Sequence, residues 1–124
     1  MNIESGAVCD ASNAGYGIQQ GPGRATTTNI GGSFASHGGY ASENSVYGHY
    51  NAEFKAGSGG GSGSGGGLVE FNIGVETMVD GVVKADGQSV GVNSGAGSGG
   101  CVVIRTYDFR GKGVFSATGG KYFL

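Results

Sequence analysis

The sequence is poor in the features that mark many functional classes of protein. Only 13% of the residues are charged, and seven Lys and Arg against nine Asp and Glu leave a formal net charge of −2. A nucleic-acid-binding surface needs a concentration of positive charge, which this composition does not supply. No apolar run approaches the length of about 18 residues that a membrane-spanning helix requires, so no membrane insertion is expected. The first residues, MNIESGAVCD, lack the basic and hydrophobic regions of a signal peptide.

Proline, cysteine and helical periodicity are also scarce. A single proline and the lack of a three-residue glycine period exclude a collagen-like chain. Two cysteines, Cys9 and Cys101, do not make a disulfide framework, and their spacing matches no zinc motif. No window of ten residues combines a 3.6-residue apolar period with helix caps, so essentially no helix is expected. The low net charge argues against disorder, because disordered chains usually carry a high net charge.

Glycine is abundant instead, and much of it is concentrated in two tracts. The 30 glycines are about a quarter of the chain, against a usual share of roughly 7%. The tract GSGGGSGSGGG (57–67) runs into LVEFNI (68–73), and the tract GAGSGG (95–100) runs into CVVIRT (101–106). Both apolar segments alternate from residue to residue, which is typical of a β-strand with one buried face. The same order of elements therefore occurs twice.

Three further segments align with one another and extend this repeat. They are AVCDASN (7–13), GVVKADG (81–87) and GVFSATG (113–119). The offset between repeats is 33 residues at the joint between glycine tract and strand (68 to 101), and 32 residues at the second segment (83 to 115). Short β units at a fixed period are typical of a solenoid, whose coils pair in parallel about 4.8 Å apart.

The repeat predicts an all-β fold, a short right-handed parallel β-solenoid with glycine-rich corners. Glycine suits tight corners because it adopts positive φ without steric cost. The alternative is a small antiparallel β-sandwich with glycine-rich hairpins. We expect a single domain, 1–124, with strand-like coils near 3–11, 68–86 and 101–118 and a long ordered loop at about 20–56.

Equivalent residues of neighbouring coils are expected to stack. The stacked pairs would be Val83 over Phe115, Ala85 over Ala117, Val69 over Val102, and Phe71 over Ile104. Cys9 and Cys101 would then lie in the first and last coils, roughly 10 Å apart. Because a disulfide needs Cα atoms within about 7 Å, two separate and mostly buried thiols are expected. ATTTNI (25–30) is expected to form one more short strand.

The first glycine tract also matches the composition of a laboratory linker. The second tract lies at the equivalent place in the repeat and is less linker-like, which favours a natural origin for both. On that interpretation 57–67 and 95–100 stack on the same side of the solenoid and are ordered despite their composition.

The order of motifs along nearly the whole chain resembles a glycine-rich β-solenoid repeat of large secreted and cell-surface proteins of animals and protists. The resemblance implies an extracellular or cell-surface location and a structural or adhesive role without known catalysis. Cys9, Cys101 and the segment 40–56 depart from the pattern. The motifs that carry the resemblance are SGAVCDASNAGYG, QGPG, ASHGGYA, VYG, GSGGGSGSGGG-LVEFNI, VDGVVKADGQ, SGAGSGG-CVVIRT and GKGVFSATGG.

No residues combine into a recognisable catalytic or metal-binding motif. His37 and His49 are the only histidines, and neither has a nucleophile and an orienting carboxylate at a suitable spacing. The repeat aligns Glu70 with Val103, so it brings no pair of carboxylates together as glycoside hydrolysis requires. The glycine tracts precede no Lys-Ser or Lys-Thr pair and no predicted helix, so a phosphate site is not expected. We therefore predict no enzymatic activity, cofactor or metal.

These observations favour a structural or scaffold module, part of a longer array or filament that assembles end to end. Its partners would be copies of itself or neighbouring repeat domains. The alternative is a carbohydrate-binding or adhesive module, which would take a polysaccharide and stack exposed tyrosines on sugar rings. The candidate residues for contact with a ligand or partner are Tyr16, Tyr40, Tyr47, Tyr50 and His37.

Overall fold

The described part of the chain is built from short and long β-strands and contains no helix. The structure, a computed structural model, describes residues 1–30, 32 and 53–121. Because these residues form no helix, none of them provides a helical membrane span. The prediction of an all-β fold is confirmed. The strands are β1 (Asn2–Ile3), β2 (Val8–Asp10), β3 (Leu68–Val79), β4 (Val82–Lys84), β5 (Cys101–Arg110) and β6 (Val114–Ser116).

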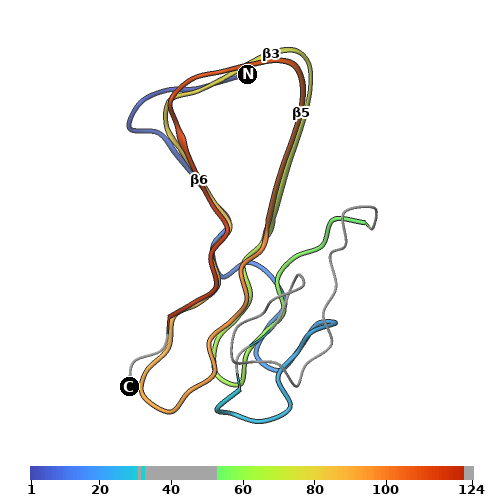
Figure 1. The fold of residues 1–124 in the computed structure, drawn as a ribbon, viewed down its shortest axis with the longest axis vertical. Coiled ribbons are helices and arrows are strands. Elements are labelled where there is room, and N and C mark those ends of the chain that lie inside the picture. Colours follow the sequence, from blue (N-terminus) through green and yellow to red (C-terminus); the bar gives the residue numbers. More distant parts are fainter. Residues whose placement is uncertain (31, 33–52, 122–124) are drawn as a thin grey trace.

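The strands form two parallel sheets of three strands each. One sheet has the order β1-β3-β5 and the other the order β2-β4-β6. All four pairings among the described strands are parallel, so the antiparallel pairing of a β-sandwich is not found there. Three passes of the chain therefore lie over one another, as Figure 1 shows for the blue, yellow and red ribbons. We call them layer 1 (1–13), layer 2 (68–87) and layer 3 (101–119).

The register between layers 2 and 3 changes by one residue within β3. Leu68 pairs with Cys101, an offset of 33, whereas Glu76 pairs with Asp108, an offset of 32. The register shift lies after Ile73, where β3 contains one residue more than β5. The slip of one residue between the two parts of the sequence repeat is therefore a β-bulge.

Equivalent residues stack as the repeat predicts. Val83 is the centre of a ladder, because it pairs with Cys9 on one side and with Phe115 on the other. Val69 pairs with Val102 in the other sheet. Phe71 pairs likewise with Ile104.

The apolar core is small and lies between the two sheets of the layers. Val69, Val79, Val83 and Ala85 are buried and form one cluster. Their positions alternate along β3 and β4 with exposed or half-buried residues, as a strand with one inward face requires. Six partly buried residues complete the cluster: Met1, Ile3, Cys9, Ala11, Phe71 and Val102.

The two glycine tracts pack side by side and are ordered, as predicted. Residues 57–61 and 95–100 are buried. The N–H of Ser98 donates to the carbonyl oxygen of Ser58 at 3.0 Å, which joins the tracts. The N–H of Gly57 donates to the carbonyl oxygen of Gly66 at 2.7 Å, within the first tract. These backbone groups are satisfied by neighbouring segments although they form no strand.

The role expected for the tract glycines, tight corners at positive φ, is wrong. Among the described glycines only Gly6, Gly21 and Gly111 have positive φ, and none of them lies in a tract. A Cβ atom built on any glycine of 57–67 or 95–100 would lie less than 3.0 Å from a backbone atom of another segment or, for Gly65, of the beginning of its own tract. Glycine is therefore needed there because the backbones approach too closely for any side chain.

The segment 25–30 is not the short strand that its threonines predict. It forms bends, and its carbonyl groups accept hydrogen bonds from the glycine tracts instead of from a sheet. The N–H of Gly95 donates to the carbonyl oxygen of Thr28 at 2.8 Å, and the N–H of Gly61 donates to that of Ile30 at 2.8 Å. Of the long loop expected at about 20–56, residues 31 and 33–52 lie outside the described part.

Cys9 and Cys101 are two separate free thiols, as expected. Both are half-buried, however, and not mostly buried. Cys9 pairs with the buried Val83, but β2 is an edge strand with a neighbour on one side only. Cys101 pairs with Leu68, which is exposed, so its side chain lies on the outward face of the sheet. Burial, and to a smaller extent the charge of Glu70, raises the pKa of the Cys101 thiol.

Candidate functional site

The stack of layers ends in two open strand edges. Among the described strands, layer 1 leaves the outer edges of β1 and β2 unpaired, and layer 3 leaves those of β5 and β6 unpaired. Such edges present backbone N–H and C=O groups to a further strand. Large apolar side chains are exposed on these edge strands: Val8 on β2, Tyr107 and Phe109 on β5, and Val114 and Phe115 on β6.

Phe115 shows that layer 3 exposes part of the apolar interior. It pairs with Val83, which is fully buried, and shares the inward position in the ladder. Phe115 nevertheless remains 40% exposed, because no further layer covers it among the described residues. Its ring contacts that of Phe109, which is also exposed, with 5.8 Å between the ring centroids. This aromatic pair gives the layer 3 end an apolar surface.

Side-chain oxygens join layers 2 and 3, and the residues that directly follow them, where the strands end. Asp80 accepts the backbone N–H of Lys112 at 3.0 Å. Ser89 accepts the backbone N–H of Lys121 in the same way, also at 3.0 Å. Both bonds span 32 residues and therefore follow the repeat. One repeat after each of these acceptors the chain has a lysine, Lys112 or Lys121, and a lysine side chain accepts no hydrogen bond.

A third connection runs through all three layers. The hydroxyl of Ser12 accepts the backbone N–H of Asp86 at 3.2 Å. The carboxylate of Asp86 accepts the backbone N–H of Thr118 at 2.8 Å and the hydroxyls of Ser116 and Thr118. Burial raises the pKa of Asp86, but these hydrogen bonds together lower it below its ordinary value.

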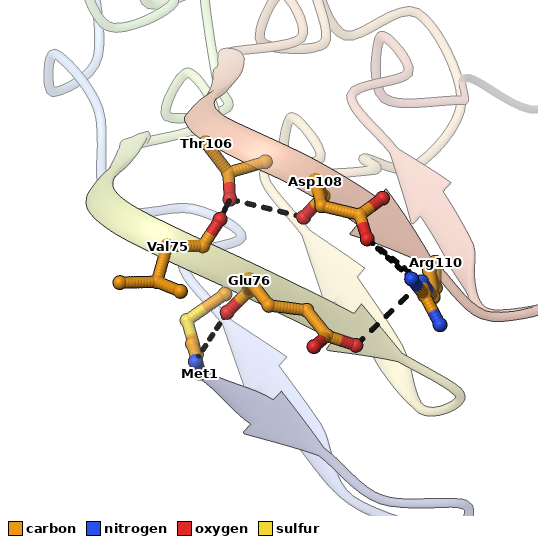
Figure 2. Close-up of polar contacts among 6 residues, drawn as sticks. All are labelled: Met1, Val75, Glu76, Thr106, Asp108 and Arg110. Atoms are coloured by element: carbon orange, nitrogen blue, oxygen red, sulfur yellow. Dashed lines mark hydrogen bonds and ion pairs between the residues drawn. The ribbon is translucent and has the colours of Figure 1, made fainter.

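Polar groups near the bulge clamp the three layers together (Figure 2). The N-terminal amine of Met1 donates to the carbonyl oxygen of Glu76 at 2.8 Å. Arg110 donates from Nε to Asp108 at 2.8 Å, and its Nε lies 3.7 Å from the carboxylate of Glu76. The hydrogen bond and charge of Asp108 raise the pKa of Arg110. The hydroxyl of Thr106 lies within hydrogen-bonding distance of the Val75 carbonyl oxygen at 3.3 Å.

A second polar cluster lies on the outer face of β3 and β5. Arg105 forms an ion pair with Glu70 and donates to Asn72 at 3.1 Å. Its guanidinium also lies over the ring of Phe54, 5.4 Å from the centroid. The hydrogen bond from Arg105 lowers the pKa of Glu70. This cluster fastens the segment before the first glycine tract to the sheet.

The two ends differ in charge. Glu4 and Asp10 are exposed in layer 1, whereas Lys112 is exposed in layer 3 and Lys121 follows that layer. Neither lysine side chain forms an ion pair among the described residues. The layer 1 edge is therefore acidic, and the layer 3 edge carries unpaired positive charge.

Of the residues expected to contact a ligand, only Tyr16 lies in the described part. This residue is 37% exposed. Its ring packs over Gly21, and its backbone N–H donates to Gly57 at 3.0 Å. Tyr40, Tyr47, Tyr50 and His37 lie outside the described residues.

The residues that distinguish the two ends were not identified by motif analysis. The expectation that the repeat brings no two carboxylates together is wrong, because the register after the bulge pairs Glu76 with Asp108, and Arg110 contacts both. The alignment of Asp86 with Thr118 is visible in the repeat, but a search for paired carboxylates does not detect a carboxylate that binds a backbone N–H. The lysines at 112 and 121 were detectable as departures from the acidic and hydroxyl residues one repeat earlier. Among the residues that the structure describes, no three His, Cys, Asp or Glu side chains gather as a metal site would require.

Comparison with known proteins adds no family to this description. No family model matches the chain, and neither a curated protein nor a solved structure matches it.

Proposed function

We propose that this chain is a non-catalytic structural module, a short right-handed parallel β-solenoid that assembles end to end in an array or filament. Its partners are copies of itself or neighbouring repeat domains. The single observation that supports this most is the exposure of Phe115, an inward residue of the last layer. A core position left 40% exposed at an open strand edge marks a surface suited to a further layer.

The energetics of a layer support the same function. A parallel neighbour satisfies backbone groups along the edge and covers the apolar residues above the core. Covering a phenylalanine side chain completely contributes roughly 1.5 to 3 kcal/mol, so burying the rest of Phe115 contributes a fraction of that. Several such contributions are needed, since association also costs translational and rotational freedom.

An extracellular or cell-surface location is part of the proposal. It is supported by the resemblance of the motif order to glycine-rich solenoid repeats of secreted and surface proteins. Adhesion to a polysaccharide is the alternative function. Its support is limited to Tyr16 among the described residues, and that ring is partly covered by its contact with Gly21. End-to-end assembly is therefore the function that the geometry supports better.

Sedimentation velocity over a wide range of protein concentrations tests the proposal. We expect a series of species that grows with concentration. Phe115→Ser is expected to shift the series towards the monomer, while Ile18→Ser, at an exposed site outside the layers, leaves it unchanged. Circular dichroism of both variants checks that the fold is kept. A chain that stays monomeric at the highest concentration contradicts end-to-end assembly.

A further inference from the structure

We propose that the copies associate head to tail, with the layer 3 edge of one copy on the layer 1 edge of the next. β6 then pairs in parallel with β2 of the next copy, which places Cys9 of the next copy over Phe115. This inference rests on the proposed function and adds to it a polarity, a register and a second copy of this chain as the occupant.

The strand registers within one chain already contain the pairing required. Val8 pairs with Val82, which pairs with Val114, and all three strands β2, β4 and β6 have three residues. A layer 1 edge placed on layer 3 at the same spacing brings Val8 of the next copy over Val114. Parallel pairing requires both copies to point the same way, whereas a two-fold pairing of β6 with β6 would be antiparallel. A head-to-tail contact therefore continues the geometry of the sheets.

The charges of the two ends favour this polarity. Ile3 pairs with Val79, so Glu4 occupies the place of Asp80 and, one layer on, of Lys112. Head-to-tail docking therefore brings Glu4 of the next copy close to Lys112. Contact between two layer 3 ends would instead bring lysines towards lysines, and contact between two layer 1 ends would bring acids towards acids. Like charges at short range oppose both of these arrangements.

Hydrogen bonding also favours layer 1, rather than layer 3, as the layer that docks on the layer 3 edge of another copy. Layer 3 itself needs side-chain acceptors from layer 2, namely Asp80 and Asp86, for the N–H groups of Lys112 and Thr118. Lys112 offers no such acceptor to whatever lies above it. In layer 1 the N–H of Ser12, which corresponds to that of Thr118, is bound within the layer by Asp10 at 2.8 Å. Layer 1 therefore requires fewer side-chain hydrogen-bond acceptors from the surface on which it docks.

A disulfide between copies tests the register directly. In a chain carrying Cys101→Ser and Phe115→Cys, the new thiol is expected to face Cys9 of the next copy one strand spacing away, about 4.8 Å. Within one chain Val83 separates these two positions, at about twice that spacing, which exceeds the roughly 7 Å that a disulfide tolerates. Mild oxidation is therefore expected to give a ladder of covalent oligomers on a non-reducing gel, reversed by reductant.

Two matched variants decide between polarities. Val114→Cys in the same background is the control, because its side chain points to the opposite face from Cys9, and no ladder is expected. Adding Cys9→Ser to Phe115→Cys is expected to abolish the ladder. A covalent dimer that persists without Cys9 indicates contact between two layer 3 ends and overturns the inference. The inference is also overturned if the chain carrying Cys101→Ser and Phe115→Cys assembles in the ultracentrifuge but forms no ladder. Failure of the unmodified chain to assemble at all overturns the proposed function as well.

Charge exchange provides a second test that needs no cysteine. Glu4→Lys and Lys112→Glu are each expected to weaken association by about two- to five-fold, as the loss of an exposed ion pair does. The two changes combined in one chain are expected to restore most of the affinity. Arg24→Glu, which changes the charge equally at an exposed site outside the layers, is the control. Failure of the double variant to recover affinity overturns the placement of Glu4 near Lys112.

Discussion

The carboxylate of Asp86 accepts the backbone N–H of Thr118 at 2.8 Å, 32 residues further along the chain. It also accepts the hydroxyls of Ser116 and Thr118, while its own backbone N–H donates to Ser12. One residue thus joins all three layers through hydrogen bonds. The stability of the stack should depend on its ionisation.

Stability is expected to fall in acid through Asp86. Its pKa in the folded chain lies below the ordinary value of 3.8. The ionised carboxylate therefore stabilises the fold fully above about pH 4, and this contribution is lost as the pH falls through the lowered pKa. Asp86→Asn should lower the free energy of unfolding at pH 7 by about 1 to 2 kcal/mol and flatten its acid dependence. Urea unfolding between pH 7 and pH 2.5 measures both, with exposed Glu53→Gln as control. If the free energy of unfolding of Asp86→Asn falls in acid as steeply as that of the unmodified chain, this role is disproved.

Alanine substitution in the glycine tracts is expected to destabilise the chain strongly. A Cβ at Gly60 would meet the Ala96 backbone, and one at Gly97 would meet the Ser64 backbone, in both cases closer than 3.0 Å. Each substitution should cost about 1 to 3 kcal/mol or more, because backbone must move to make room. Gly74→Ala is the control, since a Cβ there meets nothing within 4 Å, and a change within about 0.5 kcal/mol is expected.

Thermal or urea unfolding of these alanine variants provides the comparison. Equal stability of Gly60→Ala and Gly74→Ala would show that the tract is not packed as described. It would also restore the interpretation of 57–67 as a flexible linker.

Replacement of Thr77 by valine is expected to stabilise the fold. Thr77 is fully buried in β3, and its hydroxyl has no hydrogen-bond partner among the described residues. Valine has nearly the same shape and removes the cost of burying that hydroxyl, so Thr77→Val should raise the free energy of unfolding by about 1 kcal/mol. Thr106→Val should instead lower it, because that hydroxyl lies 3.3 Å from the Val75 carbonyl and 3.1 Å from the Asp108 carbonyl. Urea denaturation measures both, and a destabilised Thr77→Val would contradict the prediction.

Much of the strand arrangement could be predicted because the local alternation of apolar residues indicates the strands and the repeat indicates which strands pair. The pairing of Val69 with Val102 and that of Val83 with Phe115 follow from aligning two segments. Even the change of offset from 33 to 32 residues is present in the sequence. What the alignment leaves open is where the extra residue lies, and the structure places it as a bulge after Ile73.

The role of glycine could not be predicted in the same way. A glycine at a left-handed turn, such as Gly111, and one in a close backbone contact, such as Gly97, are the same letter. Only the neighbours in space distinguish them. The same holds for Phe115, because its pattern marks it as an inward residue, while its exposure depends on its place at the end of the stack.

X-ray diffraction from aligned assemblies tests the central claim, continuation of the strand stack from one copy to the next. Strands that continue across the junction give a reflection near 4.8 Å along the assembly axis, and three layers in each copy give an axial repeat of about 14 Å. We predict both spacings along the same axis. Assemblies without an axial 4.8 Å reflection, or with an axial repeat twice as long from paired opposite ends, would contradict the account.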